Sequence, residues 1–255
     1  NVRFIAALAA TNGNLLWEKR TNFPFPSAYF QADQNTLYFV TPISTTENNV
    51  MAMDLMTKTI KWSVPIGINF VGTFSELVLT QNTVLVSNST GTLSAIDKNT
   101  GSVKWKSSDP VKQPVLGRNN TILASNDKTI FCYDIETGIS KWTWKIEGNN
   151  SRILGRPTVT NNNVYILLSK NGLTYIVSLD ASTGQEKNSL AISGFTRSHL
   201  TVGNNLFLVM EDPILNFKLV RYDIPTGLGK DSIMISGHTN YSNPMVIGTT
   251  GDVYY

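Results

Sequence analysis

The sequence has few of the residues on which most catalytic and metal centres depend. It contains one cysteine, Cys132, and two histidines, His199 and His238, in 255 residues. An internal disulfide and a cysteine metal cluster are therefore excluded, and little remains for zinc or iron chemistry. Charged residues make up 15% of the chain and the formal net charge is +3. A nucleic-acid-binding protein of this size normally carries a clustered basic excess, which this composition lacks.

Long apolar runs are also missing, although the chain is far from disordered in composition. Hydrophobic residues make up 41%, and no run approaches the roughly 18 apolar residues that span a membrane. The length suits one large β or α/β domain or two small ones. Because the chain starts at Asn1 instead of Met and stops within a strand-like segment, we expect residues to be missing at both ends, where a signal peptide or lipid anchor could have been. Possible N-glycosylation acceptors, which also arise by chance in an Asn-rich chain, are Asn88, Asn119, Asn149 and Asn240.

A short pattern recurs six times and organises the whole chain. It reads Asp97-Lys-Asn-Thr-Gly101-Ser-Val-Lys-Trp105 in its clearest form, and its copies start between 37 and 46 residues apart. The second copy has Lys58 in place of the glycine, and the last two have Asn188 and Asp231 in place of the tryptophan. The repeated residues are Asp54, Asp97, Asp134, Asp180 and Asp223; Gly13, Gly101, Gly138, Gly184 and Gly227; and Trp17, Trp62, Trp105 and Trp142.

Each copy belongs to a unit of about 43 residues that reads as four short strands separated by turn residues. Strands of about five residues with turns every 8–12 residues indicate an all-β sandwich, barrel or propeller. Four strands in every repeat select the propeller. The sequence therefore predicts a single domain over residues 1–255, an all-β, six-bladed β-propeller of four-stranded antiparallel blades.

The repeated residues have a structural role at this spacing. The aspartate accepts hydrogen bonds from the N–H groups of the turn that follows, and the glycine supplies a positive φ. The tryptophan, four residues further on, is expected to lie across the gap to a neighbouring blade and bury its ring there. Trp144 is expected to point to the opposite sheet face from Trp142.

The two ends of the chain predict how the ring closes. The chain opens with two outer strands at 2–7 and 14–19 and finishes with two inner strands at 244–248 and 252–255. If the C-terminal pair lies beside the N-terminal pair, one blade is shared between the termini and no sheet edge is left open.

The pattern Asp-x-x-Thr-Gly-x-x-x-Trp resembles the repeat of the quinoprotein (PQQ-like) β-propellers over essentially the whole chain. That family includes quinone-dependent alcohol and glucose dehydrogenases. It also includes non-enzymatic scaffolds such as the lipoprotein of the bacterial outer-membrane β-barrel assembly machinery, the branch that this chain resembles. The resemblance implies that a quinone enzyme has eight blades in a longer chain, a calcium site of Glu, Asn and Asp, and often two adjacent cysteines. Here only Cys132 exists, and Glu211-Asp212 is the one close acidic pair outside the repeat. We therefore expect no catalytic residue, no metal and no cofactor.

Loop length predicts which face meets a partner. The repeat turns and the Asn-rich turns are short and should share one face of the disc. The longer loops, among them 107–113 and 147–156, should share the other. Aromatic and arginine side chains on such loops suit protein recognition, although the phenylalanines could equally pack into the core and the basic residues could simply be solvated. The candidate partner-binding residues are Phe23, Phe25, Phe70, Lys112, Arg152, Arg156, Arg197 and Tyr241.

Two further residues have plain structural interpretations. His199 could line the central channel, although a satisfied structural histidine is the simpler interpretation. Cys132 lies on an apolar strand and reads as a small core residue. The sequence thus predicts a non-catalytic, extracytoplasmic protein-binding or surface-assembly module. The alternatives are a quinone-dependent dehydrogenase and a small-ligand or glycan-binding propeller. The neutral polar surface and the usual location of the family support the predicted location, and no nucleic acid or transmembrane segment is expected.

Overall fold

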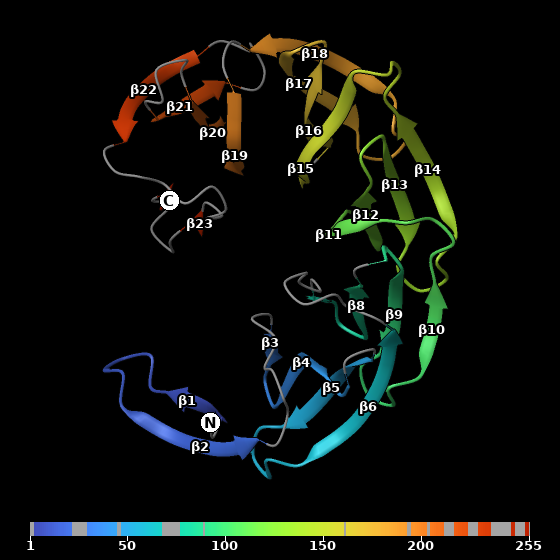
Figure 1. Ribbon diagram of the computed structural model, residues 1–255, viewed down its shortest axis with the longest axis vertical. Coiled ribbons are helices and arrows are strands. Elements are labelled where there is room, and N and C mark those ends of the chain that lie inside the picture. The colour runs from blue at the N-terminus through green and yellow to red at the C-terminus, as the bar shows by residue number, and fades with distance from the viewer. Residues whose placement is uncertain are drawn as a thin grey trace. The chain divides into compact units, whose positions relative to one another are not determined.

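The computed structural model describes residues 3–21, 30–44, 47–67, 77–88, 90–160, 162–192, 195–202, 205–211, 217–223, 229–235, 246–247 and 253–254. Every element assigned in these segments is a β strand, as the repeat predicts (Figure 1). A helix of the length and hydrophobicity needed to cross a membrane does not occur in them. Packing divides the chain into two compact units, residues 1–114 with 135–138 and residues 115–134 with 139–255. The single domain over residues 1–255 stays a prediction.

The first unit contains the strands of the first repeats as antiparallel sheets in chain order. One sheet has two strands, β1 (Arg3–Leu8) and β2 (Leu15–Thr21). The four-stranded sheets are β3 (Phe30–Asp33), β4 (Thr36–Pro42), β5 (Asn48–Asp54) and β6 (Ile60–Gly67), and β7 (Leu77–Leu79), β8 (Thr83–Ser87), β9 (Leu93–Asp97) and β10 (Val103–Lys106).

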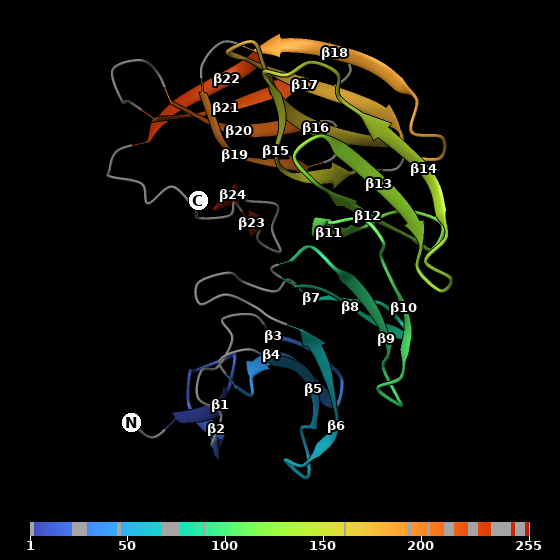
Figure 2. The ribbon, with the colours of Figure 1, turned by 45° about the vertical axis from the view of Figure 1, so that its right-hand side comes forward.

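The remaining strands form sheets of the same kind. They are β11 (Lys112–Leu116), β12 (Thr121–Ser125), β13 (Thr129–Asp134) and β14 (Ser140–Lys145); β15 (Ser151–Val159), β16 (Asn163–Lys170), β17 (Leu173–Asp180) and β18 (Glu186–Ile192); β19 (Phe195–Val202), β20 (Asn205–Glu211), β21 (Phe217–Asp223) and β22 (Gly229–Ile235); and the pair β23 (Val246–Ile247) and β24 (Val253–Tyr254). Figure 2 shows β15–β18 lying against β19–β22 within the second unit. These four-stranded antiparallel sheets are the predicted blades.

Each four-stranded sheet is a meander, so its connections alternate between its two ends. The turn between the third and fourth strands carries the repeat motif and lies at the same end as the short turn between the first and second strands. We call this the repeat-turn end. The connection between the second and third strands and the connection to the next sheet lie at the opposite end, the loop end. The repeat turns thus share one end of each sheet, as expected, but the connections at the loop end are not uniformly longer, because residues 126–128 and 171–172 form short turns there.

The core of each unit lies between neighbouring sheets, because middle strands such as β4, β8 and β16 are near-continuous apolar runs that are buried on both faces. Val50 and Ala52 of β5 pack with Val84 and Ile96 of the next sheet, and all four are fully buried. In the second unit, one buried cluster joins β11–β14 to β15–β18 and another joins β15–β18 to β19–β22. Within each unit, neighbouring sheets thus bury the faces that they share.

The repeat tryptophans connect one sheet to the next. In the second unit, Trp142 is 9% exposed and its Nε1–H donates to the carbonyl of Ala181, 3.2 Å away, in the repeat turn of the following sheet. Its ring lies on Gly184, where an added Cβ would come within 2.5 Å of ring carbon Cε3. The expected burial of this tryptophan against the neighbouring blade is confirmed.

The same contact occurs twice in the first unit. Trp62 donates to the carbonyl of Lys98 at 2.9 Å and lies on Gly101, and Trp105 donates to the carbonyl of Ile135 at 2.7 Å. The acceptor in each case is the residue that follows the repeat aspartate. The repeat therefore encodes a junction between sheets as well as a turn.

The first repeat uses a different contact at the same place. Its tryptophan, Trp17, meets Lys58, the residue that replaces the repeat glycine. The Lys58 ammonium lies 4.2 Å from the centre of the Trp17 ring, and Lys58 has φ +60 although it is not glycine. The repeat glycines described here, Gly13, Gly101, Gly138 and Gly184, have φ between +70 and +75. The backbone conformation of the turn is thus kept where the glycine is lost.

The repeat aspartates close the turns as predicted. Asp97 Oδ1 accepts hydrogen bonds from the N–H groups of Asn99 and Thr100 at 3.0 and 2.9 Å. Asp180 accepts in the same way from the N–H groups of Ser182 and Thr183. A hydrogen bond from the Lys187 ammonium, followed by the turn N–H groups, lowers the pKa of Asp180 to about 2. These aspartates are therefore charged and engaged in the turn at neutral pH.

Two sequence-based expectations need correction. Trp144 lies two residues from Trp142, so the period of a strand places both rings on the same sheet face. Both join the cluster between β11–β14 and β15–β18, and the expected opposite orientation of Trp144 is wrong. The segments 107–113 and 147–156 are also shorter loops than expected, because β11 begins at Lys112 and β15 begins at Ser151.

Candidate functional site

The candidate partner-binding residues are only partly within the described segments. Four of them lie outside these segments: Phe23, Phe25, Phe70 and Tyr241. Arg197 lies on β19, where only the backbone is described. Lys112 is exposed at the start of β11. Arg152 and Arg156 are exposed on β15. The basic candidates therefore lie on the first strands of their sheets, whereas the sequence placed them on or near loops.

A bulge in β15 presents Arg156. Pairing with β16 runs from Leu154–Leu167 directly to Thr158–Tyr165, so residues 155–157 bulge opposite a single residue, Ile166. Gly155 has φ +69, which allows the chain to turn out of the ladder, and Pro157 offers no N–H to pair. Bulges commonly re-aim a side chain near a functional site. Arg156 is thus exposed on the same strand that buries Ile153 in the core.

A partly buried ion pair joins two sheets of the first unit. The Lys98 ammonium lies 2.6 Å from Asp33 Oδ2 and donates to the Thr80 carbonyl at 3.0 Å. It also lies 5.6 Å from the centre of the Tyr38 ring, and the Tyr38 hydroxyl donates to Asp33 at 3.4 Å. Burial, reinforced by the Asp33 charge, raises the pKa of Tyr38 to about 12. Tyr38 therefore stays protonated at neutral pH, which suits a structural junction and not a general base.

Cys132 has the environment of a core residue. It lies on β13 opposite Trp142 and is 1% exposed. Burial raises the pKa of its thiol, so the thiolate that a nucleophile needs is disfavoured. Where the structure describes side chains, no three His, Cys, Asp or Glu groups gather closely enough to hold a metal ion.

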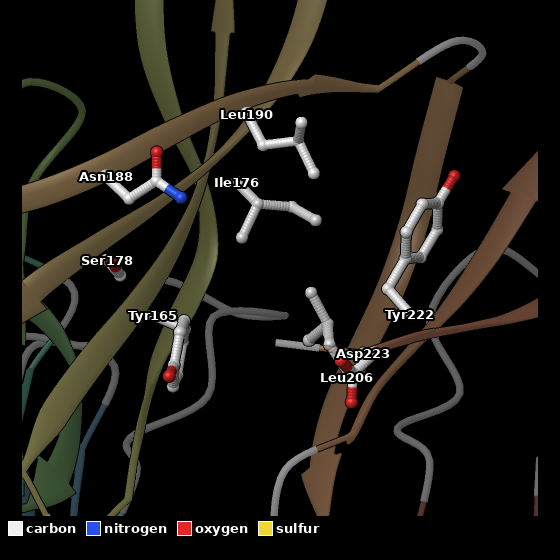
Figure 3. A pocket seen from close by; sticks show the side chains of 8 residues that line it. All are labelled: Tyr165, Ile176, Ser178, Asn188, Leu190, Leu206, Tyr222 and Asp223. Carbon is white, nitrogen blue, oxygen red and sulfur yellow. The ribbon is translucent and has the colours of Figure 1, made fainter. Parts of the chain in front are cut away.

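A small cavity lies between β15–β18 and β19–β22 in the second unit (Figure 3). Its volume is about 30 Å³, which is room for one or two water molecules. Ile176, Leu190 and Leu206 form its apolar wall, and oxygen-bearing side chains complete the lining: Tyr165, Ser178, Asn188, Tyr222 and Asp223. In Figure 3 the side chains of β16–β18 face Tyr222 and Leu206 of the next sheet across it.

Strand register shows what this cavity replaces. In the four-stranded sheets that keep the repeat tryptophan, it pairs with a small residue on the third strand, as in Trp62–Ala52 and Trp142–Cys132. At the corresponding position of β15–β18, Asn188 pairs with Ser178, and both line the cavity. The space therefore lies where a repeat tryptophan lies in the neighbouring junctions.

A larger hollow of about 220 Å³ lies on the face of β19–β22 that points away from β15–β18. Phe207, Leu219 and Ile233 line it, together with an ion pair in which Arg221 Nη2 lies 2.6 Å from Asp231 Oδ2. Asp231 is the second residue that replaces a repeat tryptophan. Ile233 is 63% exposed, so this apolar face is uncovered within the second unit.

The glycosylation candidates differ in their surroundings. Asn119 and Asn149 are exposed in turns, whereas Asn240 lies outside the described residues. The Asn88 amide donates to the Ile66 carbonyl at 2.8 Å, and its oxygen accepts from the N–H of Thr92 at 2.8 Å. A glycan on Asn88 would displace these hydrogen bonds, so Asn119 and Asn149 offer the more accessible amides.

Sequence reasoning missed the lysine that precedes the repeat tryptophan. Lys104 contacts Glu136 Oε2 at 2.6 Å and donates to Thr83 Oγ1 at 2.9 Å. Lys187, at the same position of its repeat, contacts Asp180 at 2.8 Å. The signal was present, since Lys61, Lys104 and Lys141 each stand directly before a tryptophan. Lys104 and Lys187 thus form ion pairs between the fourth strand of a sheet and a repeat turn.

Three solved structures illustrate the proteins with a similar fold. BamB from Moraxella catarrhalis matches with TM-score 0.55 and 15% identity over 95% of this chain and 90% of its own. A europium-containing methanol dehydrogenase matches with TM-score 0.57 and 15% identity, over 83% of this chain and 53% of its own. The computationally designed Ika8 protein matches with TM-score 0.60 and 15% identity, over 98% and 89%. At such identities the likeness establishes the fold alone, a propeller of PQQ-like repeats.

A comparison with curated protein sequences finds no significant match. The family model described as outer membrane protein assembly factor BamB, in contrast, matches residues 3–228, nearly the whole chain. This match agrees with the repeat motif, the four-stranded blades and the tryptophan junctions. The chain therefore belongs to the PQQ-like repeat family described as outer membrane protein assembly factor BamB.

Proposed function

We propose that this chain is a six-bladed propeller that acts as a non-catalytic, protein-binding scaffold outside the cytoplasm. Membership of the BamB family and the similar fold of the Moraxella catarrhalis protein support a scaffold role and a periplasmic or outer-membrane-associated location. The observation that carries the proposal is the bulge in β15, which holds exposed Arg156 on a well-packed sheet. The low content of cysteine and histidine supports a role without catalysis.

Closure of the ring is the first part of this proposal. Phe4 and Leu16 are 50% and 64% exposed on the face of β1–β2 opposite to the one that packs on β3–β6. The outer face of β19–β22 carries its own uncovered apolar hollow. We infer that β23, β24, β1 and β2 form the sixth blade, and that this blade covers the outer face of β19–β22. Closure would remove both exposed apolar faces and the open strand edges.

Deleting residues 2–19 tests this closure. The deletion removes β1 and most of β2, so the sixth blade loses its outer strands. The apolar faces that this blade covers then become exposed to solvent. We expect a lower midpoint of thermal unfolding and stronger binding of a dye that reports exposed apolar surface. Cooperative unfolding at the parent midpoint would show that the termini do not close the ring.

The partner-binding surface is the second part of the proposal. Arg152 and Arg156 are exposed on the first strand of their sheet, and Arg152 stands near its loop end. Arginine is enriched at interfaces because its planar group makes several directed hydrogen bonds at once. The short repeat turns, in contrast, are occupied by their own aspartates and by the tryptophan junctions. We therefore propose that the partner contacts β15 from Arg152 at its loop end to the bulge, the loop-end surface, with Arg156 as an anchor.

Replacing Arg156 by alanine is expected to weaken partner binding about 30-fold, since truncation of an interface anchor costs about 2 kcal/mol or more. The partner is first isolated by affinity capture, and its Kd is then measured for each variant. Arg118 is also exposed but belongs to a repeat-turn end, so Arg118→Ala is the matched control and should bind like the parent. Both variants should unfold at the parent temperature. If Arg118→Ala loses binding while Arg156→Ala binds like the parent, the partner contacts the repeat-turn end and the proposal is wrong.

The alternative is a quinone-dependent dehydrogenase, which the fold of the europium-containing methanol dehydrogenase favours. This chain spans only about half of that protein. We expect purified protein mixed with pyrroloquinoline quinone and either calcium or europium to show no dye-linked oxidation of alcohols or sugars. A ligand that binds the folded state alone also raises the melting temperature as its concentration rises. A saturable rise of this kind together with turnover would establish the enzyme and overturn the scaffold proposal.

A further inference from the structure

The cavity between β15–β18 and β19–β22 has the surroundings of a tryptophan site without its tryptophan. Three repeat tryptophans place an indole between neighbouring sheets and donate their Nε1–H to an oxygen of the next sheet. Asn188 stands at the same strand position, opposite small Ser178, and lines the cavity. Because backbone register and sheet spacing set the size of such a junction, the loss of the large side chain leaves its volume to be filled.

The lining chemistry matches a neutral ring that carries an N–H donor. Ile176, Leu190 and Leu206 offer apolar contacts for the faces of a ring. Ser178, Asn188 and Asp223 bring oxygen atoms to the same wall, and the Asp223 carboxylate disfavours an anion. The Tyr222 hydroxyl lies 3.8 Å from the Met210 sulfur, a weak acceptor. Among aromatic groups, an indole satisfies both the apolar and the polar part of this lining.

We propose that this cavity is a binding site for an indole group, which takes the place that a repeat tryptophan takes in the neighbouring junctions. The present volume of about 30 Å³ holds water and not a ring. Asn188 is exposed, however, so its side chain can rotate into solvent and leave the tryptophan position open. The indole belongs either to a free small molecule or to a tryptophan side chain of a bound protein segment. The site is independent of the loop-end surface and does not rest on the scaffold function.

Indole itself is the first probe, added to the full chain while the melting temperature and the binding heat are measured. We expect a saturable rise in melting temperature with indole and no such rise with cyclohexanol, which has no aromatic ring. Asn188→Ala removes the side chain that has to rotate away, so it should bind indole several-fold more tightly than the parent. Asn188→Trp fills the site from within, so it should melt at a higher temperature than the parent and no longer respond to indole.

A second variant keeps the proposal testable if Asn188→Trp fails to fold. Trp142→Ala vacates the equivalent position of the preceding junction, so it should lower the melting temperature and gain a second indole site. A capped Gly-Trp-Gly peptide separates the two sources. Binding of both probes indicates a tryptophan of a protein segment, and binding of indole alone indicates a free small molecule. The proposal is overturned if neither the parent nor Asn188→Ala binds indole, or if Asn188→Trp responds to indole as the parent does.

Discussion

Replacing Trp142 by alanine is expected to lower the free energy of unfolding by about 3–5 kcal/mol, the usual cost of deleting a large buried ring. Trp142 is 9% exposed and joins the cluster between β11–β14 and β15–β18. It also carries a hydrogen bond to Ala181 in the next sheet, so its removal weakens the junction itself as well as the core. Chemical denaturation, followed by circular dichroism, measures the change.

Trp142→Phe is the matched control for this prediction. It keeps an aromatic ring in the junction but loses the Nε1–H that reaches the Ala181 carbonyl. The expected loss is smaller than that of alanine, because one net hydrogen bond contributes about 1 kcal/mol. Equal losses for the two variants would mean that the hydrogen bond, and not the ring, holds the junction. An unchanged free energy of unfolding for Trp142→Ala would contradict the role of the repeat tryptophan.

Replacing Gly184 by alanine is expected to cost about 2–5 kcal/mol through two separate effects. The residue has φ +71, a left-handed conformation that costs a residue with a side chain about 1–2 kcal/mol. The new Cβ would also come within 2.5 Å of the Trp142 ring, so the ring or the turn must move, at about 1–3 kcal/mol. Denaturant unfolding of the purified variant gives the total.

Gly13 separates the two effects because it occupies the same repeat position. Its φ is +74, but nothing lies within 4 Å of the position its Cβ would take. Gly13→Ala should therefore cost only the conformational part, about 1–2 kcal/mol. In a Trp142→Ala background, Gly184→Ala should cost no more than Gly13→Ala does in the parent. Equal costs for Gly13→Ala and Gly184→Ala in the parent chain would show that the ring contact contributes nothing.

The blades and their junctions could be predicted from the sequence because the information is local and repeated. A nine-residue motif contains the aspartate, the glycine and the tryptophan, and each of them has one physical task. The aspartate bonds, the positive φ and the buried ring all followed from that spacing. The change at Asn188 was visible as well, but the cavity it leaves depends on two sheets that meet only in the folded protein.

Other features could not be predicted because their causes are not local. Asp33 and Lys98 are 65 positions apart in the chain, and nothing near either residue signals the ion pair. Arg156 was expected on a loop but lies on β15, because the residues on both sides of it, Ser151–Leu154 and Thr158–Val159, pair with β16. Trp144 was misplaced for a simpler reason, since residues two apart in a strand share a face. Six-bladed closure stays a prediction, because Asp231 of β22 stands where a repeat tryptophan would join β19–β22 to the sixth blade.

Site-specific photo-crosslinking tests the central claim, a protein partner on the loop-end surface of β15, most directly. A photoreactive amino acid is placed singly at 152 or 156 of β15, and at exposed 162 or 182 of the repeat-turn end of the same sheet. The chains are irradiated in a cell-envelope fraction from the source organism, and adducts are identified by mass spectrometry. We predict the same protein adduct from positions 152 and 156, and none from 162 and 182. A defined adduct from 162 or 182 with none from 152 or 156 would contradict the account.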